Sequence, residues 1–211
     1  MTDSHSSPPP SKPPRRGWHY RGYLPHFDGG NEWLQFVTFR LADSLPTQVL
    51  EGWRRQLETL PESAQRAELI ERVDNYLDAG HGACWLRQPE IATMVEHALQ
   101  HFDGERYELH SWVVMPNHVH VLFRPLGQYD LQGILHTWKS FTAKQANQML
   151  QRTGAFWQAD YFDRYVRSEE HYLATKVYID ANPSRAGLCA AEDLWPFGSR
   201  RFENKERKAI P

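Results

Sequence analysis

The segment 112–123 constrains this chain most, because it places two imidazoles two residues apart within an apolar, β-branched stretch. Successive side chains of a strand point to opposite faces, so His118 and His120 share one face while Val119 and Val121 enter a core on the other. Neutral imidazole is the commonest metal ligand in proteins, and two rings on one strand can chelate a single ion. In a chain with 11 histidines, such a pair also fits a half-buried strand with polar residues on its wetter side, so both interpretations stay open.

A second segment, near the end of the chain, complements this pair. The stretch after Ser168 begins with two glutamates and meets a proline at Pro183, which predicts a helix between them that ends at Asn182. Tyr178 and Asn182 are four residues apart, so both project from the same side of its last turns. One helix would then present a phenol and an amide oxygen together. The alternative is that Tyr178 belongs to the core and that Asn182 only ends the helix.

Taken in order, these motifs resemble the HUH-type single-tyrosine transposases, and most closely the REP-associated tyrosine transposases of bacteria. The similarity runs from about Gly22 to Gly198 and includes Met115-Pro116-Asn117-His118-Val119-His120, Phe156-Trp157-Gln158, Tyr161 to Arg167, Glu169-Glu170-His171, Tyr178-Ile179, Asn182-Pro183 and Ala186-Gly187-Leu188. The resemblance implies that Tyr178 is the nucleophile and that His118, His120 and Asn182 hold a divalent metal. Better-known members have glutamine at the third ligand position, where this chain has the shorter asparagine.

The implied chemistry needs these residue types. A tyrosine hydroxyl has an ordinary pKa near 10 and is a poor nucleophile at neutral pH until a base or a cation helps it. Attack on a DNA phosphate would leave a 5′-phosphotyrosine and a free 3′-hydroxyl, and a second 3′-hydroxyl could reverse the step and join strands. Two histidines and an amide leave coordination positions open, which favours Mg²⁺ or Mn²⁺ over a closed zinc site. The resemblance implies single-stranded DNA hairpins, REP-like palindromes, as partners.

Composition limits the other possibilities. A chain of 211 residues can bury one core, and we expect a single domain with an insertion. It has neither a run of 18 apolar residues nor a signal-peptide pattern, so we expect a soluble, cytoplasmic and nucleoid-associated protein with no membrane partner. Cys84 and Cys189 lie far apart and are expected to be reduced thiols. A net charge of −2 argues against a general polyanion binder.

The charge is unevenly distributed along the sequence. The segment 43–90 carries nine acidic residues against five arginines, so the remainder of the chain is slightly basic. Aromatic residues are interspersed among the basic clusters, a combination that holds single strands by stacking and phosphate contacts. The candidate DNA-binding residues are Arg15, Arg16, Arg21, Lys139, Lys144, Arg164, Arg167, Arg200 and Arg201. Each could equally be a solvated charge, and Arg164 and Arg167 could form salt bridges with Asp163 or Glu170 instead.

The order of predicted elements indicates an α+β protein. Strands are predicted at 34–41, 107–114, 118–124 and within 156–167, and helices at 46–60, 61–79, from Pro89, at 130–150 and before Pro183. Family resemblance implies a ferredoxin-like sandwich with a central antiparallel sheet and the tyrosine helix packed across it. Residues 1–16 are expected to be a disordered Ser/Pro-rich tail, 17–198 the transposase-like domain and 199–211 a basic tail. The helical insertion at about 46–80 could form a lid, contact DNA or a partner, or decorate one edge.

Three functions remain open at this stage. The first is a strand transferase cleaving at hairpin DNA, and the second is a related nuclease such as a replication initiator or relaxase, for which 211 residues leave little room. The third is a catalytically idle hairpin DNA- or RNA-binding regulator, as a monomer or homodimer. Other candidate residues are Tyr161 and Tyr165 as nucleophiles, His110, His136 and His171 as ligands or proton shuttles, and Asn117 as a positioning or turn residue.

Overall fold

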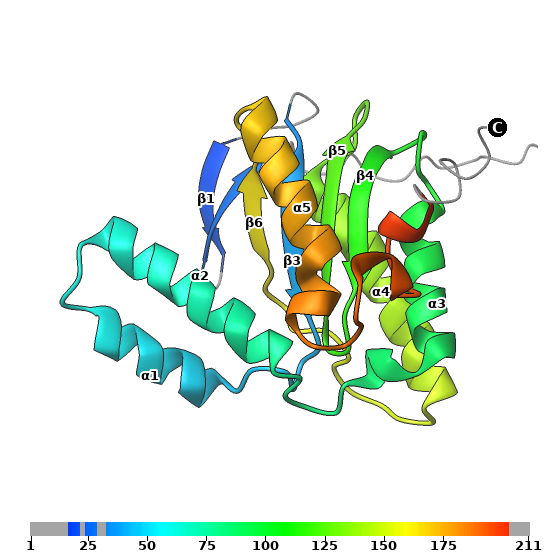
Figure 1. Cartoon of the computed structure of the whole chain (residues 1–211), viewed down its shortest axis with the longest axis horizontal. Coiled ribbons are helices and arrows are strands. Elements are labelled where there is room, and N and C mark those ends of the chain that lie inside the picture. The colour runs from blue at the N-terminus through cyan, green and yellow to red at the C-terminus, as the bar shows by residue number, and fades with distance from the viewer. Residues whose placement is uncertain (1–16, 22–23, 29–32, 203–211) are drawn as a thin grey trace, which may run out of the picture.

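The central feature of the structure, a computed structural model, is a four-stranded antiparallel sheet in the order β4-β5-β3-β6 (Figure 1). The structure describes residues 17–21, 24–28 and 33–202, and for the first two ranges it describes the backbone only. The strands are β3 (Gln35–Arg40), β4 (Tyr107–Val114), β5 (His118–Pro125) and β6 (Phe162–Tyr165). The histidine strand β5 therefore lies inside the sheet.

The connections between these strands define two interlocked β-α-β units. Helices connect β3 to β4 and β5 to β6, and in each case a strand of the other unit lies between the two connected strands. Strands β4 and β5 form a hairpin. This is the split arrangement of the ferredoxin-like fold. The predicted α+β class with a central antiparallel sheet and a helical insertion is confirmed.

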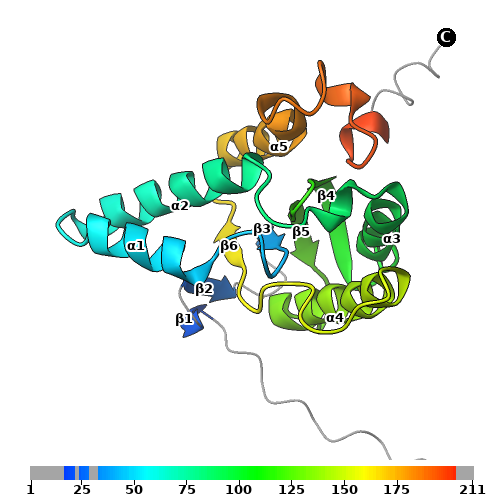
Figure 2. The same ribbon diagram turned by 90° about the horizontal axis from the view of Figure 1, so that it is seen from below.

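Two helices cover one face of the sheet. Figure 2 shows α3 (Pro89–Gln100) and α4 (Leu131–Met149) on the same side, opposite α5. Val119 and Val121 point into this layer and pack with Trp138 of α4 and Leu99 of α3. Burial of side chains of this size stabilises a fold by about 1.5–3 kcal/mol each. The sequence prediction that the two valines face the main core is confirmed.

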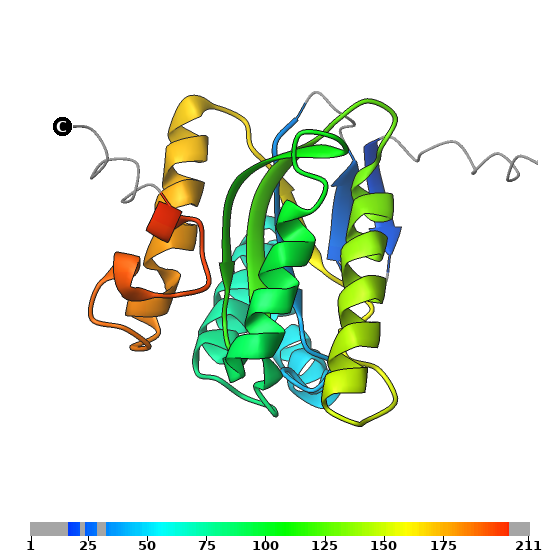
Figure 3. The same cartoon turned by 90° about the vertical axis from the view of Figure 1, so that its right-hand side faces the viewer.

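Helix α5 (Glu169–Arg185) covers the other face of the sheet (Figure 3). Its first turn is capped by Ser168, whose Oγ accepts a hydrogen bond from the backbone N–H of His171 at 3.2 Å. Ile179 is wholly buried and packs with Phe36 of β3 and Leu122 of β5. The helix therefore lies across the face that carries the two histidines.

The predicted end of this helix at Asn182 is wrong. The helix runs through Pro183 to Arg185. Proline lacks an N–H and therefore removes only the hydrogen bond to the carbonyl four residues earlier. The next turn still closes, because the N–H of Ala186 bonds to the carbonyl of Asn182 at 3.0 Å. Asn182 is thus an internal helical residue and not a stop.

The insertion is a pair of helices, α1 (Thr47–Leu57) and α2 (Glu62–Asp78), each of which starts directly after a proline, as predicted. Figures 1 and 2 show the pair projecting past the β6 edge, while the C-terminal end of α2 lies beside α5. Trp53 and Tyr76 meet edge to face across the two helices, with ring centroids 5.5 Å apart. The two inserted helices therefore pack on each other, and α2 contacts the rest of the domain through its C-terminal end.

A two-stranded antiparallel sheet precedes the main fold. It pairs β1 (Gly17–Arg21) with β2 (Leu24–Asp28). The sequence patterns predict no strand in this stretch. The predicted disordered tail at 1–16 lies outside the described residues.

The C-terminal segment packs on β4. The backbone N–H of Ser199 bonds to the Trp112 carbonyl at 2.9 Å, and Arg201 forms an ion pair with buried Glu96. Residues 199–202, assigned to a basic tail from the sequence, are therefore part of the packed domain; residues 203–211 lie outside the described range. Within the described part of the chain, no helix has both the length and the apolar character needed to span a bilayer.

Candidate active site

The two histidines of β5 lie buried between the sheet and α5. His118 and His120 are 0% and 1% exposed. Leu122, two residues further along the same face, packs with Ile179 of α5. The Nε2 atoms of the two imidazoles point toward one another and are 3.0 Å apart. This convergence places two potential ligand atoms around one point.

Each imidazole is held from behind by a polar side chain. Nδ1 of His118 lies 2.7 Å from Oδ1 of Asn117, and Nδ1 of His120 lies 2.7 Å from Oγ1 of Thr38 on β3. The Nδ2 of Asn117 donates to the carbonyl of His81 at 2.9 Å, which fixes the orientation of its amide. Nδ1 of His118 is therefore the donor to Asn117, and its Nε2 carries the lone pair that a metal needs. The positioning role of Asn117 that the sequence left open is supported by this contact.

Burial keeps both rings neutral. It lowers the pKa of His118 to about 3 and the pKa of His120 well below its ordinary value, with the charges of His118 and Arg185 acting in the same direction on His120. Neutral imidazoles can face each other at this distance only with a shared hydrogen or a cation between them. The pair is thus prepared either for an internal hydrogen bond or for a metal ion.

Tyr178 of α5 lies against the histidine pair. Its ring meets His120 edge to face, with centroids 5.3 Å apart, and meets Phe36 at 5.8 Å. The guanidinium of Arg185, two turns later, is 5.4 Å from the centroid of the same ring. Residues separated by 58 positions in sequence are therefore in direct ring contact. The structure brings the predicted nucleophile to the predicted ligands.

The hydroxyl of Tyr178 is buried and makes no hydrogen bond of standard geometry, although the Asp74 carboxylate is close enough to act on it. Burial, followed by the charges of Asp74 and Asp78, raises the pKa of Tyr178 above its ordinary value, and Arg185 opposes the rise. The phenol is therefore fully protonated in this structure. Its reaction as a nucleophile requires a proton acceptor and added positive charge.

Asn182 lies one helical turn after Tyr178 and is wholly buried, yet neither its Oδ1 nor its Nδ2 has a hydrogen-bond partner. A buried amide without partners is costly, so a missing partner is indicated. Two adjacent ligands of an octahedral ion at about 2.1 Å stand about 3.0 Å apart, which matches the Nε2 separation. The residues present fit Mg²⁺ or Mn²⁺. No group of three His, Cys, Asp or Glu side chains in the described ranges has ready metal-binding geometry. A third ligand to accompany the two histidines would therefore have to be the Asn182 amide.

Two carboxylates of α2 reach this site, and the sequence analysis missed them. Asp74 acts on the Tyr178 hydroxyl, while Oδ1 of Asp78 is 3.8 Å from Nε2 of His118. Burial raises the pKa of each carboxyl to about 6, and Arg185 opposes the rise in both. The sequence did contain an indication of these two residues. Both acids continue the apolar face of α2 that contains Ile70 and Leu77, and burial of a carboxylate there costs free energy, so its presence on this face indicates a function.

Of the candidate DNA-binding residues, Arg164 is brought to the site. Its guanidinium lies 5.8 Å from the Phe36 ring and is close enough to Asp74 and Tyr178 to interact with their charges. Arg167 lies nearby over the Tyr165 ring at 4.8 Å. Arg164 can therefore contact a phosphate near the Tyr178 hydroxyl.

The structure does not bring the other candidates together. Lys139 and Lys144 lie on α4, across the sheet from Tyr178, and Lys139 donates to the carbonyls of Gln158 and Ala159. Arg200 and Arg201 lie beside Glu192 and Glu96. Arg21 is described by its backbone alone, and Arg15 and Arg16 lie outside the described residues. Clustering in sequence does not produce one basic surface here, because successive elements pack on opposite faces of the sheet.

The alternative nucleophiles and ligands are placed elsewhere. Tyr161 packs in the main core with α4, on the far face of the sheet, and Tyr165 packs edge to face with Trp33. The described contacts of the other three histidines involve other groups: His110 faces Tyr172, His171 lies in the first turn of α5, and His136 is exposed on α4. Tyr178 is the tyrosine that stands next to the His118–His120 pair.

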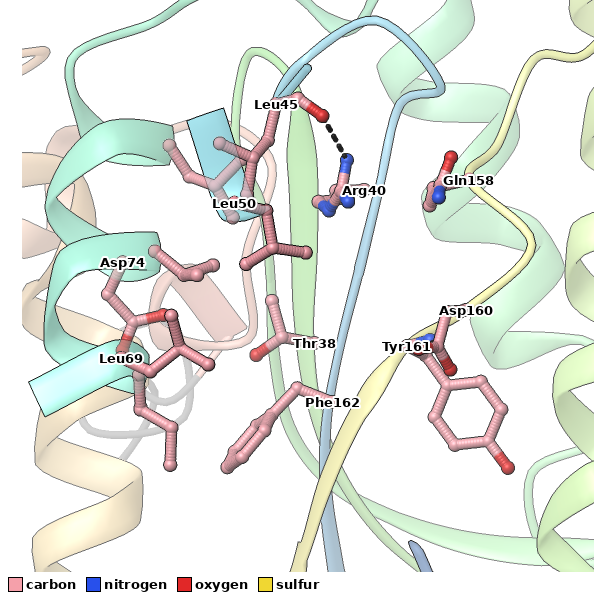
Figure 4. A pocket seen from close by; sticks show the side chains of 13 residues that line it. Thr38, Arg40, Leu45, Leu50, Leu69, Asp74, Gln158, Asp160, Tyr161 and Phe162 are labelled. Carbon is pink, nitrogen blue, oxygen red and sulfur yellow. Dashed lines mark hydrogen bonds between the residues drawn. The ribbon is translucent and has the colours of Figure 1, made fainter. Parts of the chain in front are cut away.

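A pocket adjoins the site between α2 and the β3–β6 edge of the sheet (Figure 4). Its walls are largely apolar and include Leu69 of α2 and Phe162 of β6. Thr38 and Asp74 line the pocket and also contact the active groups, Thr38 through His120 and Asp74 through Tyr178. Helix α2 of the insertion therefore forms one wall of the pocket next to Tyr178.

We expect Asn117→Ala to weaken Mn²⁺ binding about 10–100-fold, because the ring of His118 loses the partner that fixes its tautomer and orientation. Isothermal titration calorimetry of the full chain with MnCl₂ measures this directly. Asn147→Ala is the matched control: Asn147 donates to the Gly154 carbonyl on the far face of the sheet and should leave Mn²⁺ binding unchanged. Equal affinity in the two variants would remove Asn117 from the site.

We expect Asp74→Asn to stabilise the metal-free protein by about 1–3 kcal/mol at pH 8. The pKa of Asp74 is raised to about 6, so the folded state binds its proton more tightly than the unfolded state, and ionisation destabilises the fold as the pH rises through 6. The groups that face it are Tyr178, Arg164, Arg185 and Asp78. Thermal melting should show the gain at pH 8 and its loss near pH 4. Glu71→Gln, at an exposed position of α2, should show no such gain, and a destabilised Asp74→Asn protein at pH 8 would contradict the assignment.

Comparison with known proteins finds similarity to one class of protein. The family model described as "Transposase IS200 like" matches residues 86–182, which contain the histidine pair, Tyr178 and Asn182. A REP-associated tyrosine transposase of Escherichia coli (strain K12) is 25% identical over 108 residues, which cover 50% of this chain and 62% of the relative. The match thus spans less than two thirds of that protein. The resemblance to the REP-associated tyrosine transposases that the motifs predict is confirmed.

A solved structure supports the fold. The structure of a REP-associated tyrosine transposase bound to a REP hairpin superposes with a TM-score of 0.52 and 20% identity, covering 92% of this chain and 88% of that chain. At this identity the similarity concerns the fold alone. It agrees with the ferredoxin-like arrangement described above.

Proposed function

We propose that this protein is a transposase-type, metal-dependent endonuclease and strand transferase that acts on single-stranded hairpin DNA through Tyr178. The observation that carries the proposal is the ring contact between Tyr178 and His120, at 5.3 Å, within a buried histidine pair. A tyrosine that only filled the core would not need two converging neutral imidazoles and an unpaired buried amide beside it. The family match and the REP hairpin bound by the structural neighbour support DNA hairpins as the substrate class.

The covalent step follows from the residues around the hydroxyl. The Oη atom of Tyr178 attacks the phosphorus, and its proton passes to the Asp74 carboxylate, which interacts with it in this structure. The bond from phosphorus to the 3′ oxygen breaks, and that oxygen takes a proton from water. The products are a 5′-phosphotyrosine on Tyr178 and a free 3′-hydroxyl. Attack by another 3′-hydroxyl reverses the step and joins two strands without a further source of energy.

His118, His120 and Asn182 would hold the divalent cation. When bound, Mg²⁺ or Mn²⁺ would polarise the phosphate and neutralise charge that develops during attack. The chain's own contribution is to keep both imidazoles neutral by burial and to fix their direction through Asn117 and Thr38. Arg164 and Arg185 add positive charge near the Tyr178 ring.

An idle hairpin DNA- or RNA-binding regulator on the same fold is the second candidate. Its supporting observation is that the Tyr178 hydroxyl is buried, and that this burial and the charges of Asp74 and Asp78 raise its pKa above the ordinary value. A regulator would bind hairpins but would not need Asn182, Asp74 and the histidine pair around a tyrosine. Covalent attachment to DNA separates the two functions.

The decisive test is incubation of the full chain with 5′- and 3′-labelled single-stranded hairpin oligonucleotides in Mn²⁺, followed by a denaturing gel. We expect a protein–DNA adduct that carries the label from the 3′ side of the cut and a released fragment with a free 3′-hydroxyl. Addition of EDTA should prevent both. Binding of hairpins with no adduct under any divalent ion would favour the regulator.

A further inference from the structure

The inserted helix α2 ends at the histidine pair. Oδ1 of Asp78, its last residue, lies 3.8 Å from Nε2 of His118, the nitrogen that faces His120. This oxygen is buried and has no hydrogen-bond partner. Asp78 therefore directs an unpaired carboxylate oxygen toward the point on which both imidazoles converge.

A hydrogen bond between Asp78 and His118 does not explain this placement. A separation of 3.8 Å is too long for one, and the proton-bearing Nδ1 of His118 is already bonded to Asn117. The distance lies between the two separations expected for two ligands of one octahedral ion. Ligand atoms at about 2.1 Å from an octahedral ion stand about 3.0 Å apart when adjacent and about 4.2 Å apart when opposite.

An independent observation also indicates a ligand. Asn182 lies on α5, and it is wholly buried with both polar atoms unpaired. Helix α2 and helix α5, which carries Tyr178 against His120, thus each have a side chain with buried, unpaired polar atoms. The Asp78 side chain is 16% exposed. Because no three His, Cys, Asp or Glu side chains of the described ranges have ready metal-binding geometry, Asp78 would have to move toward the two imidazoles to complete the set.

The chemistry of the ion favours such a residue. Two neutral imidazoles and an amide supply no negative charge, whereas Mg²⁺ and Mn²⁺ prefer oxygen ligands and gain affinity with ligand charge. We propose that Asp78 of the inserted helix is a further ligand of the divalent cation, so that the insertion completes the metal site. This inference rests on the proposed function. The family match begins at residue 86 and leaves α2 outside it.

The proposal gives the insertion a role that its sequence left open. Helices α1 and α2 project from the β6 edge, and Trp53 against Tyr76 joins them into one unit. Because Asp78 and Asp74 lie one turn apart on α2, the same helix places one carboxylate at His118 and one at Tyr178. An ion bound by Asp78 would therefore also fix the position of the helix that carries Asp74.

Isothermal titration calorimetry of the full chain with MnCl₂ tests the proposal. We expect Asp78→Asn, which keeps the size of the side chain, to weaken Mn²⁺ binding at least about 10-fold, and we expect the same of His118→Ala. Glu71→Gln, an exposed carboxylate on the same helix, should bind as the wild type does. Circular dichroism melting confirms that each variant is folded.

The outcomes separate the inference from the proposed function. Unchanged Mn²⁺ affinity in Asp78→Asn, together with a loss in His118→Ala, would overturn the role of Asp78 and leave the histidine site intact. Absence of Mn²⁺ binding to the wild type would overturn both.

A second variant gives a gain of binding and does not depend on the first. Thiolates prefer soft ions, so Asp78→Cys should weaken Mn²⁺ binding at least about 10-fold and strengthen Cd²⁺ binding by a similar factor relative to the wild type. Cys84 and Cys189 are present in both proteins, so their contribution cancels. Equal Cd²⁺ affinity in the two proteins would contradict a metal-facing position for residue 78.

Discussion

The variant Tyr178→Phe is expected to lose covalent attachment to hairpin DNA by a factor on the order of 10³ or more, while hairpin binding changes less than about twofold. Only the attacking oxygen is removed, and the ring contacts with His120 and Phe36 remain. Because the ring packing is kept and the hydroxyl makes no hydrogen bond of standard geometry, its loss should change the melting temperature little. A denaturing gel for the adduct and fluorescence anisotropy for binding measure the two effects separately.

The control for this variant is Tyr172→Phe, two turns earlier on α5. Its hydroxyl lies 3.5 Å from Nδ1 of His110, away from the histidine pair, so the yield of adduct should stay at the wild-type level. An adduct that persists in Tyr178→Phe would assign the nucleophile to another residue.

The second large effect is expected from the histidine pair. Replacement of His118 or His120 by alanine should reduce cleavage in Mg²⁺ or Mn²⁺ on the order of 10²-fold, and EDTA should do the same to the wild type. Each variant removes one of two buried Nε2 atoms that stand 3.0 Å apart. Single-turnover cleavage at saturating DNA isolates this effect from binding.

His97→Ala provides the comparison, because His97 is exposed on α3 on the other side of the sheet. It should cleave at the wild-type rate in both metals. If the wild type cleaves equally well with EDTA and with Mg²⁺, the ion has no part in the reaction, and the histidines would have to act in another way.

Much of the fold could be predicted from local patterns. Alternation around His118 and His120 identifies a strand and assigns its two faces, because a strand buried on one side must present every second residue to the core. The central place of this strand is implied by the family resemblance. The prolines before Thr47 and Glu62 mark the starts of both inserted helices. The end of α5 could not be predicted, since whether a helix continues past Pro183 depends on how the following turn closes.

The site was only partly visible in the sequence, for a physical reason. Strand and helix periodicities put His118 with His120, and Tyr178 with Asn182, on one face each. Their roles could be named because the motifs, taken in order, resemble the HUH-type single-tyrosine transposases. Asp74 and Asp78 lie on a helix whose place in space depends on tertiary packing, so no local pattern connects them to the histidines. The same limit applies to Lys139 and Lys144. Their positions in the sequence do not show on which face of the sheet their helix packs.

The most direct test of the central claim is mass mapping of the residue that carries DNA. Trypsin cuts after Lys176 and Arg185, so Tyr178 is the sole tyrosine of the peptide 177–185, whereas Tyr161, Tyr165 and Tyr172 fall in three other peptides. After nuclease trimming of the adduct, we expect the added nucleotide mass on peptide 177–185 alone. The same mass on a peptide with another tyrosine, and none on 177–185, would contradict the account.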